Sequence, residues 1–148
     1  MTVITTFEEK RKDKQMKLER KLLKELSIKK LTESVQSYFG NIRIRSASFY
    51  QEGFNEACYD VAVESYLIGG KISRLGRYGE TAEQLKLRVN KELKHFSDTL
   101  FNFWLYWSEM GVAGQIDESL YYTCEQFVNH WWQEGYQAGI QRQKLRLH

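Results

Sequence analysis

The stretch SYLIGGKISRLGRYGE, residues 65–80, decides between two folds, because its glycines and basic residues suit either a phosphate-binding loop or a helix corner. A phosphate loop of the Walker type needs the pattern GxxxxGK[ST] directly after a buried strand. Gly69-Gly70-Lys71 instead follows a helical pattern, and Ile72, not a hydroxyl residue, comes after the lysine. Gly69 or Gly70 in the left-handed position that ends a helix, with Lys71 near its negative pole, explains the stretch without a ligand. The sequence therefore predicts a corner between helices.

The segments on both sides of this corner have helical patterns. Ser48 with Gln51 and Thr81 with Gln84 match the capping box that opens a helix. The chain contains no proline, which favours long helices with short connections. We expect four main helices, with a break near Ser27 in the first, over residues 7–38, 48–68, 81–110 and 117 to the 140s. The predicted fold is all-α, a helical bundle of about four main helices.

Length and cysteine content limit the class of protein. The 148 residues form one domain, 1–148, in which residues 1–6 could be flexible. No apolar run approaches the 18 or so residues of a membrane-spanning helix, and no secretion signal opens the chain. Cys58 and Cys124 lack CxxC spacing, which is typical of a reduced compartment. We expect a cytoplasmic protein that does not bind a membrane.

Charge is unevenly distributed although the net charge is only +3. Residues 71–94 are basic, and residues 95–140 contain no Lys or Arg. Pairing of these charges inside the fold is favoured over a nucleic-acid partner, which usually requires a stronger basic excess. The alternative is an anion or nucleic-acid binder that uses the basic 71–94 region. A possible anion site is then Lys71, Arg74 and Arg77, just before a helix N-terminus.

No catalytic constellation stands out. Glu92-x-x-His95 has a spacing used in di-iron bundles, but no second ExxH exists, and helical geometry turns His95 and His130 outward. Cys58 and Cys124 lie on apolar stripes and are expected to be buried structural thiols. We therefore expect no enzyme activity, no cofactor and no metal. A metal-dependent bundle enzyme is the third hypothesis.

The aromatic region is the most informative part of the chain. Residues 95–140 hold twelve of the 21 aromatic residues, and FNFWLYW, 101–107, is apolar around the whole helix. The last helix carries two apolar stripes, which one small bundle would struggle to bury. The sequence thus predicts a protein-interaction or assembly module and a homodimer formed through the aromatic 95–140 region, or an unidentified protein partner. Its expected anchors are Tyr106, Trp132 and Tyr136.

Two glycines in the last helix predict a close helix crossing. Gly135 and Gly139 lie one turn apart, and glycine inside a helix costs about 0.5–1 kcal/mol relative to alanine. Close approach of another backbone would explain both positions. Gly53 and Ala57 offer a matching small surface on the second helix.

Three stretches carry a resemblance to a known family: KLERKLLKELSI (17–28), YDVAVESYLIGGKISRLGRYGE (59–80) and WWQEGYQAGIQRQKLRLH (131–148). They resemble the YbaK-type small cytosolic proteins of Bacillus and relatives, a domain-of-unknown-function family, over essentially the whole chain. The resemblance implies a bacterial cytosolic protein and supplies no activity, cofactor or catalytic residue.

Overall fold

The computed structural model describes residues 3–40, 48–109 and 118–145, and every regular element in these ranges is helical. Six α-helices and one 3-10 helix follow one another along the chain: α1 (Val3–Glu25), α2 (Ile28–Phe39), α3 (Ser48–Ile72), η1 (Ser73–Tyr78), α4 (Ala82–Arg88), α5 (Asn90–Glu109) and α6 (Glu118–Lys144). The predicted all-α class is confirmed. The predicted number of about four main helices is too low.

Two breaks account for the difference in helix number. The predicted first helix stops at Glu25 and restarts at Ile28, because extended Ser27 (φ −85°, ψ 120°) caps α2 by accepting a hydrogen bond of 3.2 Å from the Lys30 N–H. The predicted third helix breaks at Val89, whose backbone leaves the helical region (φ −108°, ψ 14°). Both breaks occur without proline, as caps and local backbone turns.

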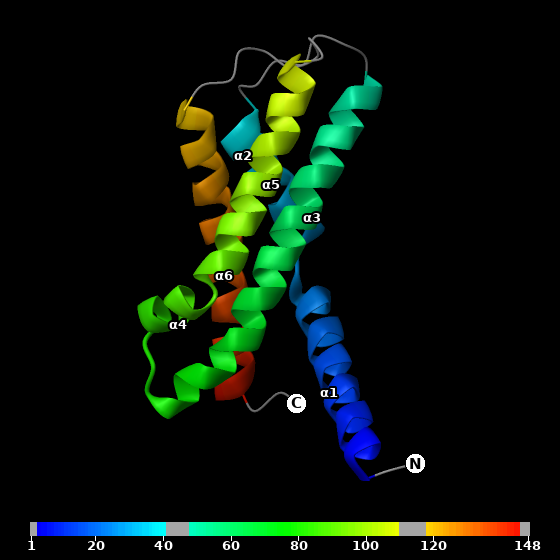
Figure 1. Ribbon diagram of the computed structural model, residues 1–148, viewed down its shortest axis with the longest axis vertical. Helices are drawn as coiled ribbons and strands as arrows, with labels where there is room; N and C mark the ends of the chain where they lie inside the picture. Colours follow the sequence, from blue (N-terminus) through cyan, green and yellow to red (C-terminus); the bar gives the residue numbers. More distant parts are fainter. Residues whose placement is uncertain (1–2, 41–47, 110–117, 146–148) are drawn as a thin grey trace.

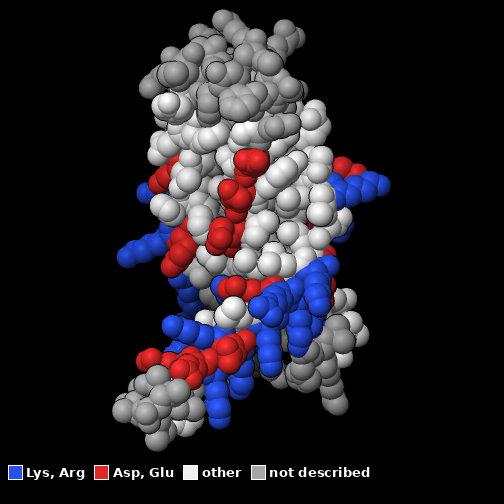
Figure 2. All heavy atoms as spheres, turned by 90° about the vertical axis from the view of Figure 1, so that its right-hand side faces the viewer, with Lys and Arg blue, Asp and Glu red and all other residues white. Residues whose placement is uncertain are grey.

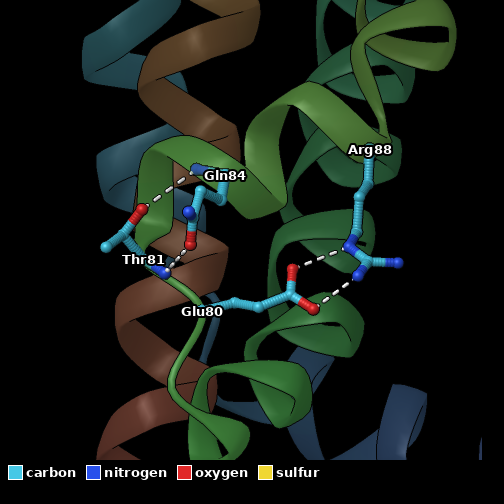
Figure 3. Close-up of polar contacts among 4 residues, drawn as sticks. All are labelled: Glu80, Thr81, Gln84 and Arg88. Atoms are coloured by element: carbon cyan, nitrogen blue, oxygen red, sulfur yellow. Dashed lines mark hydrogen bonds and ion pairs between the residues drawn. The ribbon is translucent and has the colours of Figure 1, made fainter.

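The capping box at the start of α4 is confirmed. The Thr81 hydroxyl accepts a hydrogen bond from the Gln84 N–H at 3.2 Å, and the Gln84 side chain accepts one from the Thr81 N–H at 2.9 Å (Figure 3). Arg88, at the other end of the same short helix, reaches back to Glu80 with two hydrogen bonds of 2.7 and 2.5 Å. The predicted capping box of Ser48 and Gln51 rests on side chains outside the described part of the chain.

Figure 1 shows α2, α3, α5 and α6 side by side, while α1 diverges toward the lower right. α3 and α6 run in the same direction and share the most extensive helix contact, and α5 runs opposite to both. Aromatic rings fill the space between them: Phe54 stacks on Trp104 at 4.1 Å between ring centres, and Phe39 packs edge-on against Phe127. On α3, the side that faces these rings includes Phe54, Cys58, Val61 and Ser65, all of which are buried.

The contact between α3 and α6 depends on glycine, at positions that differ in part from the prediction. A Cβ at Gly135 would collide with the Tyr66 carbonyl, and one at Gly139 would collide with Ser73 Oγ and lie 2.7 Å from the Gly70 carbonyl oxygen. The close crossing with the second predicted helix is therefore present. Its surface on α3 is not Gly53 and Ala57, because a Cβ at Gly53 would meet nothing within 4 Å.

The opening stretch is a corner, but its first two glycines do not end a helix. Gly69 and Gly70 lie inside α3, where Gly69 packs against the Trp132 carbonyl and Gly70 against Leu22. These glycines allow close packing on two sides of α3, and the helix continues past them to Ile72. The left-handed residue is Gly79 (φ 91°), which ends η1.

Candidate interaction surface

The C-terminal third of α1 is anchored to α3 by packing and by a buried hydrogen bond. Leu22 is fully buried, and a Cβ at Gly70 would lie 2.5 Å from its Cδ1 atom. The Tyr66 hydroxyl donates a hydrogen bond of 3.0 Å to the Leu22 carbonyl, which lies in the last turn of α1 and has no helical partner of its own. Leu22 is thus held from both its side chain and its backbone.

Two ion pairs flank this anchor. Glu19 of α1 pairs with Lys71 in the last turn of α3, and Glu25 at the end of α1 pairs with Arg142 of α6. The Arg142 side chain is mostly buried, whereas Glu19 and Lys71 are partly exposed. The anchored part of α1 therefore spans Glu19 to Glu25.

The environment of Tyr66 keeps its hydroxyl protonated. Burial, together with the nearby carboxylates of Glu25 and Glu134 and against the opposing effect of Arg142, raises the pKa of Tyr66 to about 12. A protonated phenol is what the hydrogen bond to the Leu22 carbonyl requires. The anchor is consequently intact at neutral pH.

Residues 7–17 of α1 have no packing partner in the described part of the chain. Every residue from 7 to 17 is exposed, and this part of the helix leaves the bundle (Figure 1). Five lysines recur along α1 at spacings of four and three residues, which places them on one side of the helix. This lysine face consists of Lys10, Lys14, Lys17, Lys21 and Lys24. Sequence reasoning missed it, although the spacing was visible.

The outer side of α3 carries the opposite charge. Glu56, Asp60 and Glu64 are exposed at i,i+4 spacing and form what we call the acidic face. Figure 2 shows the side of the molecule formed by α3 above and α1 below: carboxylates make a column on the upper half, and Lys and Arg gather over the lower half. Among the described residues, no ion pair involves the lysine face or the acidic face. Like charges so close on a helix are unfavourable without a basic partner.

The possible anion site is only partly placed. Lys71 is engaged by Glu19, and Arg74 is exposed in η1. The side chain of Arg77 lies outside the described part of the chain. The helix that follows, α4, has only seven residues. The anion site at these three basic residues therefore stays a prediction, and Lys71 is already paired with a carboxylate of the same chain.

The predicted aromatic interface needs a correction. Trp132 is only 2% exposed and stacks on Tyr136 at 5.3 Å between ring centres, so it cannot anchor a second chain without unfolding its own. Tyr136 is half-buried, and Tyr106 is 56% exposed. The expectation that one bundle would leave an apolar stripe of the last helix uncovered is met only in part, since one stripe is buried and the other is half-buried at Tyr121, Tyr136 and Ile140. Leu120, Cys124, Phe127, Val128 and Trp131 are all buried, because α6 packs against α1, α2, α3, α5 and η1.

The two histidines differ in their surroundings. Glu92 and His95 are exposed, as predicted. His130 is half-buried and lies near the rings of Tyr38 and Trp131, at 5.9 and 5.3 Å between ring centres, so it is less exposed than predicted. Within the described ranges, no group of three or more His, Cys, Asp and Glu residues is arranged to hold a metal ion.

The cysteines behave as structural thiols. Cys58 and Cys124 are free and fully buried, which confirms the predicted location. Burial raises the pKa of Cys124 to about 12 and raises that of Cys58 as well. Neither is a thiolate at neutral pH, so neither is a ready nucleophile.

One open cleft of about 530 Å³ lies between α4 and α6. Its lining mixes two carboxylates, an ammonium, an imidazole, amides and two rings: Ala82, Glu83, Lys86, His130, Trp132, Gln133, Glu134, Tyr136 and Gln137. The volume would suit a small molecule. The lining holds no Ser, Thr or Cys that could act as a nucleophile, and its charges nearly balance.

Comparisons with known proteins give a family without an activity. The model of the family described as "Protein of unknown function (DUF2521)" matches residues 1–148. The chain is similar to "Uncharacterized protein YbaK" of Bacillus subtilis (strain 168), with 26% identity over 147 residues that cover 99% of each chain. No solved structure matches the chain. The resemblance seen in the three quoted stretches is thereby confirmed. None of the described helices has the length and apolarity to cross a membrane.

Proposed function

Because the chain belongs to the DUF2521 family, whose function is unknown, we propose its role from its own surface: a cytoplasmic protein-interaction module that assembles as a homodimer and is not an enzyme. The observation that carries this proposal is the exposed part of α1. Residues 7–17 extend a helix beyond the bundle, and every one of them is exposed.

Helix stability explains why this extension points to a partner. A free helix of fewer than about 12–15 residues is marginal in water, since most helical stability in proteins comes from tertiary packing. The anchored segment from Glu19 to Glu25 supplies a helical start, but residues 7–17 gain no packing of their own. Phe7 and Met16, both mostly exposed, would gain burial from a second chain.

The aromatic 95–140 region supports the proposal less than its composition suggested. Within the described side chains of that region, the large hydrophobic residues that remain exposed are Tyr106 and Tyr122. These two could extend an interface but are too few to form its centre. We therefore place the association on α1.

The proposed absence of enzyme activity is supported by the chemistry of the buried thiols and of the cleft between α4 and α6. The buried thiols are protonated, and the cleft between α4 and α6 lacks a nucleophile. The unpaired state of Cys58 and Cys124 fits a reducing cytoplasm.

The alternative is an anion or nucleic-acid binder that uses the basic 71–94 region. It is weaker, because Lys71 and Arg88 of that region are already paired with Glu19 and Glu80. A metal-dependent enzyme is weaker still, since Glu92 and His95 are exposed with no further ligand grouped around them in the described ranges.

Light scattering after size-exclusion chromatography tests the proposal. Full-length protein at micromolar concentration and low salt should give about twice the 17.6 kDa chain mass. A concentration series should show the transition to monomer on dilution. A mass of one chain at every concentration would reject the homodimer, and nucleic-acid binding by that monomer would favour the alternative.

A further inference from the structure

We propose that two copies associate by laying the lysine face of α1 from one chain on the acidic face of α3 from the other, so that the contact forms twice. This inference rests on the proposed homodimer and specifies its surface. It accounts for the two sets of like charges that stay without ion pairs in the described chain.

The direction of α1 keeps Lys10, Lys14 and Lys17 away from the acidic face of their own chain. Leu22 contacts Tyr66 and Gly70, and Glu19 contacts Lys71. The two helices are therefore antiparallel, and residues earlier in α1 lie beside residues later in α3. Residues 7–17 therefore pass the end of α3 at Ile72 and point away from the acidic face. Only another molecule can bring these lysines to the carboxylates.

The part of the lysine face that extends beyond the bundle, Lys10 to Lys17, matches the acidic face in length. At about 1.5 Å per residue, the stretch from Lys10 to Lys17 is about 10 Å long and that from Glu56 to Glu64 about 12 Å. Both have a repeat of one helical turn, so successive ammonium groups can meet successive carboxylates. Glu19 with Lys71 shows that the same two helices already pair by charge at the anchor.

Symmetry makes such a surface self-complementary. The side shown in Figure 2 has a column of carboxylates over its upper half and mainly basic residues, with some carboxylates among them, over its lower half. A two-fold axis in the plane of this side, perpendicular to the long axis, places the lower half of each copy on the upper half of the other. The same patch is then used on both subunits, as a two-fold dimer requires. Complementary charge also fixes the register of the two helices.

A polyanion is a poorer occupant of the lysine face. Nucleic acid or an anionic membrane bound along α1 would leave the acidic face of α3 without a basic partner. A second copy satisfies both faces at once, and the net charge of +3 gives little general attraction to polyanions.

Charge exchange between the two faces provides the test. One variant carries Lys10→Glu, Lys14→Glu and Lys17→Glu, and the other carries Glu56→Lys, Asp60→Lys and Glu64→Lys. Each alone should fall from about twice 17.6 kDa to 17.6 kDa under conditions where the wild type is dimeric. An equimolar mixture should return to the dimer mass, because one contact then pairs opposite charges with reversed sign and the other is the wild-type contact. Salt should dissociate the wild-type dimer, since exposed charge pairs are screened.

A matched control separates surface effects from net charge. Lys29→Glu, Lys30→Glu and Lys91→Glu change the net charge by as much as the lysine-face variant does, at exposed positions outside both faces, and this variant should remain dimeric. Circular dichroism should show the helix content of the wild type in every variant. A dimeric wild type whose two face variants also stay dimeric would overturn this inference and leave the homodimer standing. Two monomeric face variants that do not form a dimer when mixed would also overturn this inference. A monomeric wild type would reject the proposed function itself.

Discussion

The indole N–H of Trp131 donates a hydrogen bond of 3.0 Å to the hydroxyl of Ser34, which lies 97 residues earlier in the chain. The same hydroxyl donates its own proton to the Leu31 carbonyl at 2.8 Å, so Ser34 acts as acceptor and donor together. All atoms involved are buried. This relay fixes α2 on α6 and removes the cost of burying the indole N–H.

We predict that Ser34→Ala destabilises the protein by about 1–3 kcal/mol, the usual cost of leaving a buried polar group without its partner. Urea denaturation would measure the change in the free energy of unfolding. Ser37→Ala, at an exposed position of the same helix, is the control and should change it by less than about 0.5 kcal/mol. Equal effects of the two substitutions would contradict the role of the relay.

The glycines of α6 should respond to substitution in the opposite way from Gly53. Gly135→Ala and Gly139→Leu force a side chain into the α3 backbone or Ser73 and should cost about 1–3 kcal/mol or more through overpacking. Gly53→Ala adds a Cβ in open space within a helix and should stabilise by about 0.4–1 kcal/mol. Melting temperatures should fall for Gly135→Ala and Gly139→Leu and rise for Gly53→Ala. A raised melting temperature for Gly139→Leu would mean that the crossing is not tight.

Removal of the Tyr66 hydroxyl should loosen α1 more than the bundle. Tyr66→Phe deletes the hydrogen bond to the Leu22 carbonyl, at a cost of about 0.5–1.5 kcal/mol. Hydrogen exchange should accelerate in α1 and stay unchanged in α5. Tyr59→Phe, on the same helix and half-buried, is the matched control. Faster exchange throughout the chain would show that Tyr66 supports the core instead.

Alkaline pH should destabilise the fold through the same residue. Tyr66 has a folded pKa of about 12 against an ordinary value of 10.0, so the unfolded chain loses its phenol proton first. Stability should therefore fall as pH rises from about 10 to about 12 and change no further through Tyr66 above that range. Tyr121, whose pKa is also raised to about 12 by its hydrogen bond to Asp98, adds to the loss. The pH slope should be smaller in Tyr66→Phe than in the wild type, and an identical slope would contradict this assignment.

Both thiols should resist modification in the folded protein. Cys58 and Cys124 are buried and have raised pKa values, so a thiol reagent at neutral pH should react only as fast as the chain opens. In denaturant, both should react rapidly, which provides the internal control. Rapid reaction of either cysteine under native conditions would contradict the packing of α3 on α6.

Features that depend on neighbouring residues could be predicted from the sequence. Thr81 and Gln84 identified the start of α4 because a capping box is complete within four residues. The break at Ser27 follows from the same local chemistry. The buried stripe of α3 was predictable because helical periodicity alone determines which residues share a face.

Features that depend on distant contacts could not be predicted. Gly69 looked like a helix end because left-handed caps and close crossings both call for glycine, and the Trp132 carbonyl that decides between them comes much later in the chain. Trp132 looked like an interface residue because a helical wheel assumes one buried side, whereas several elements cover α6. The lysine face has a clear spacing, but its exposure depends on where α1 leaves the bundle.

The parallel pairing of α3 and α6 also affects how fast the protein reaches its native state. Ser73 accepts a hydrogen bond from the Gln143 side chain at 3.2 Å across 70 residues of intervening chain. The helices that form the centre of the core therefore meet only after a long loop has closed, which costs entropy before any packing is gained. Folding rates fall as the average separation of contacting residues rises. Refolding should accordingly be slower than for an up-and-down bundle of equal length, with helices forming before the glycines of α6 reach α3.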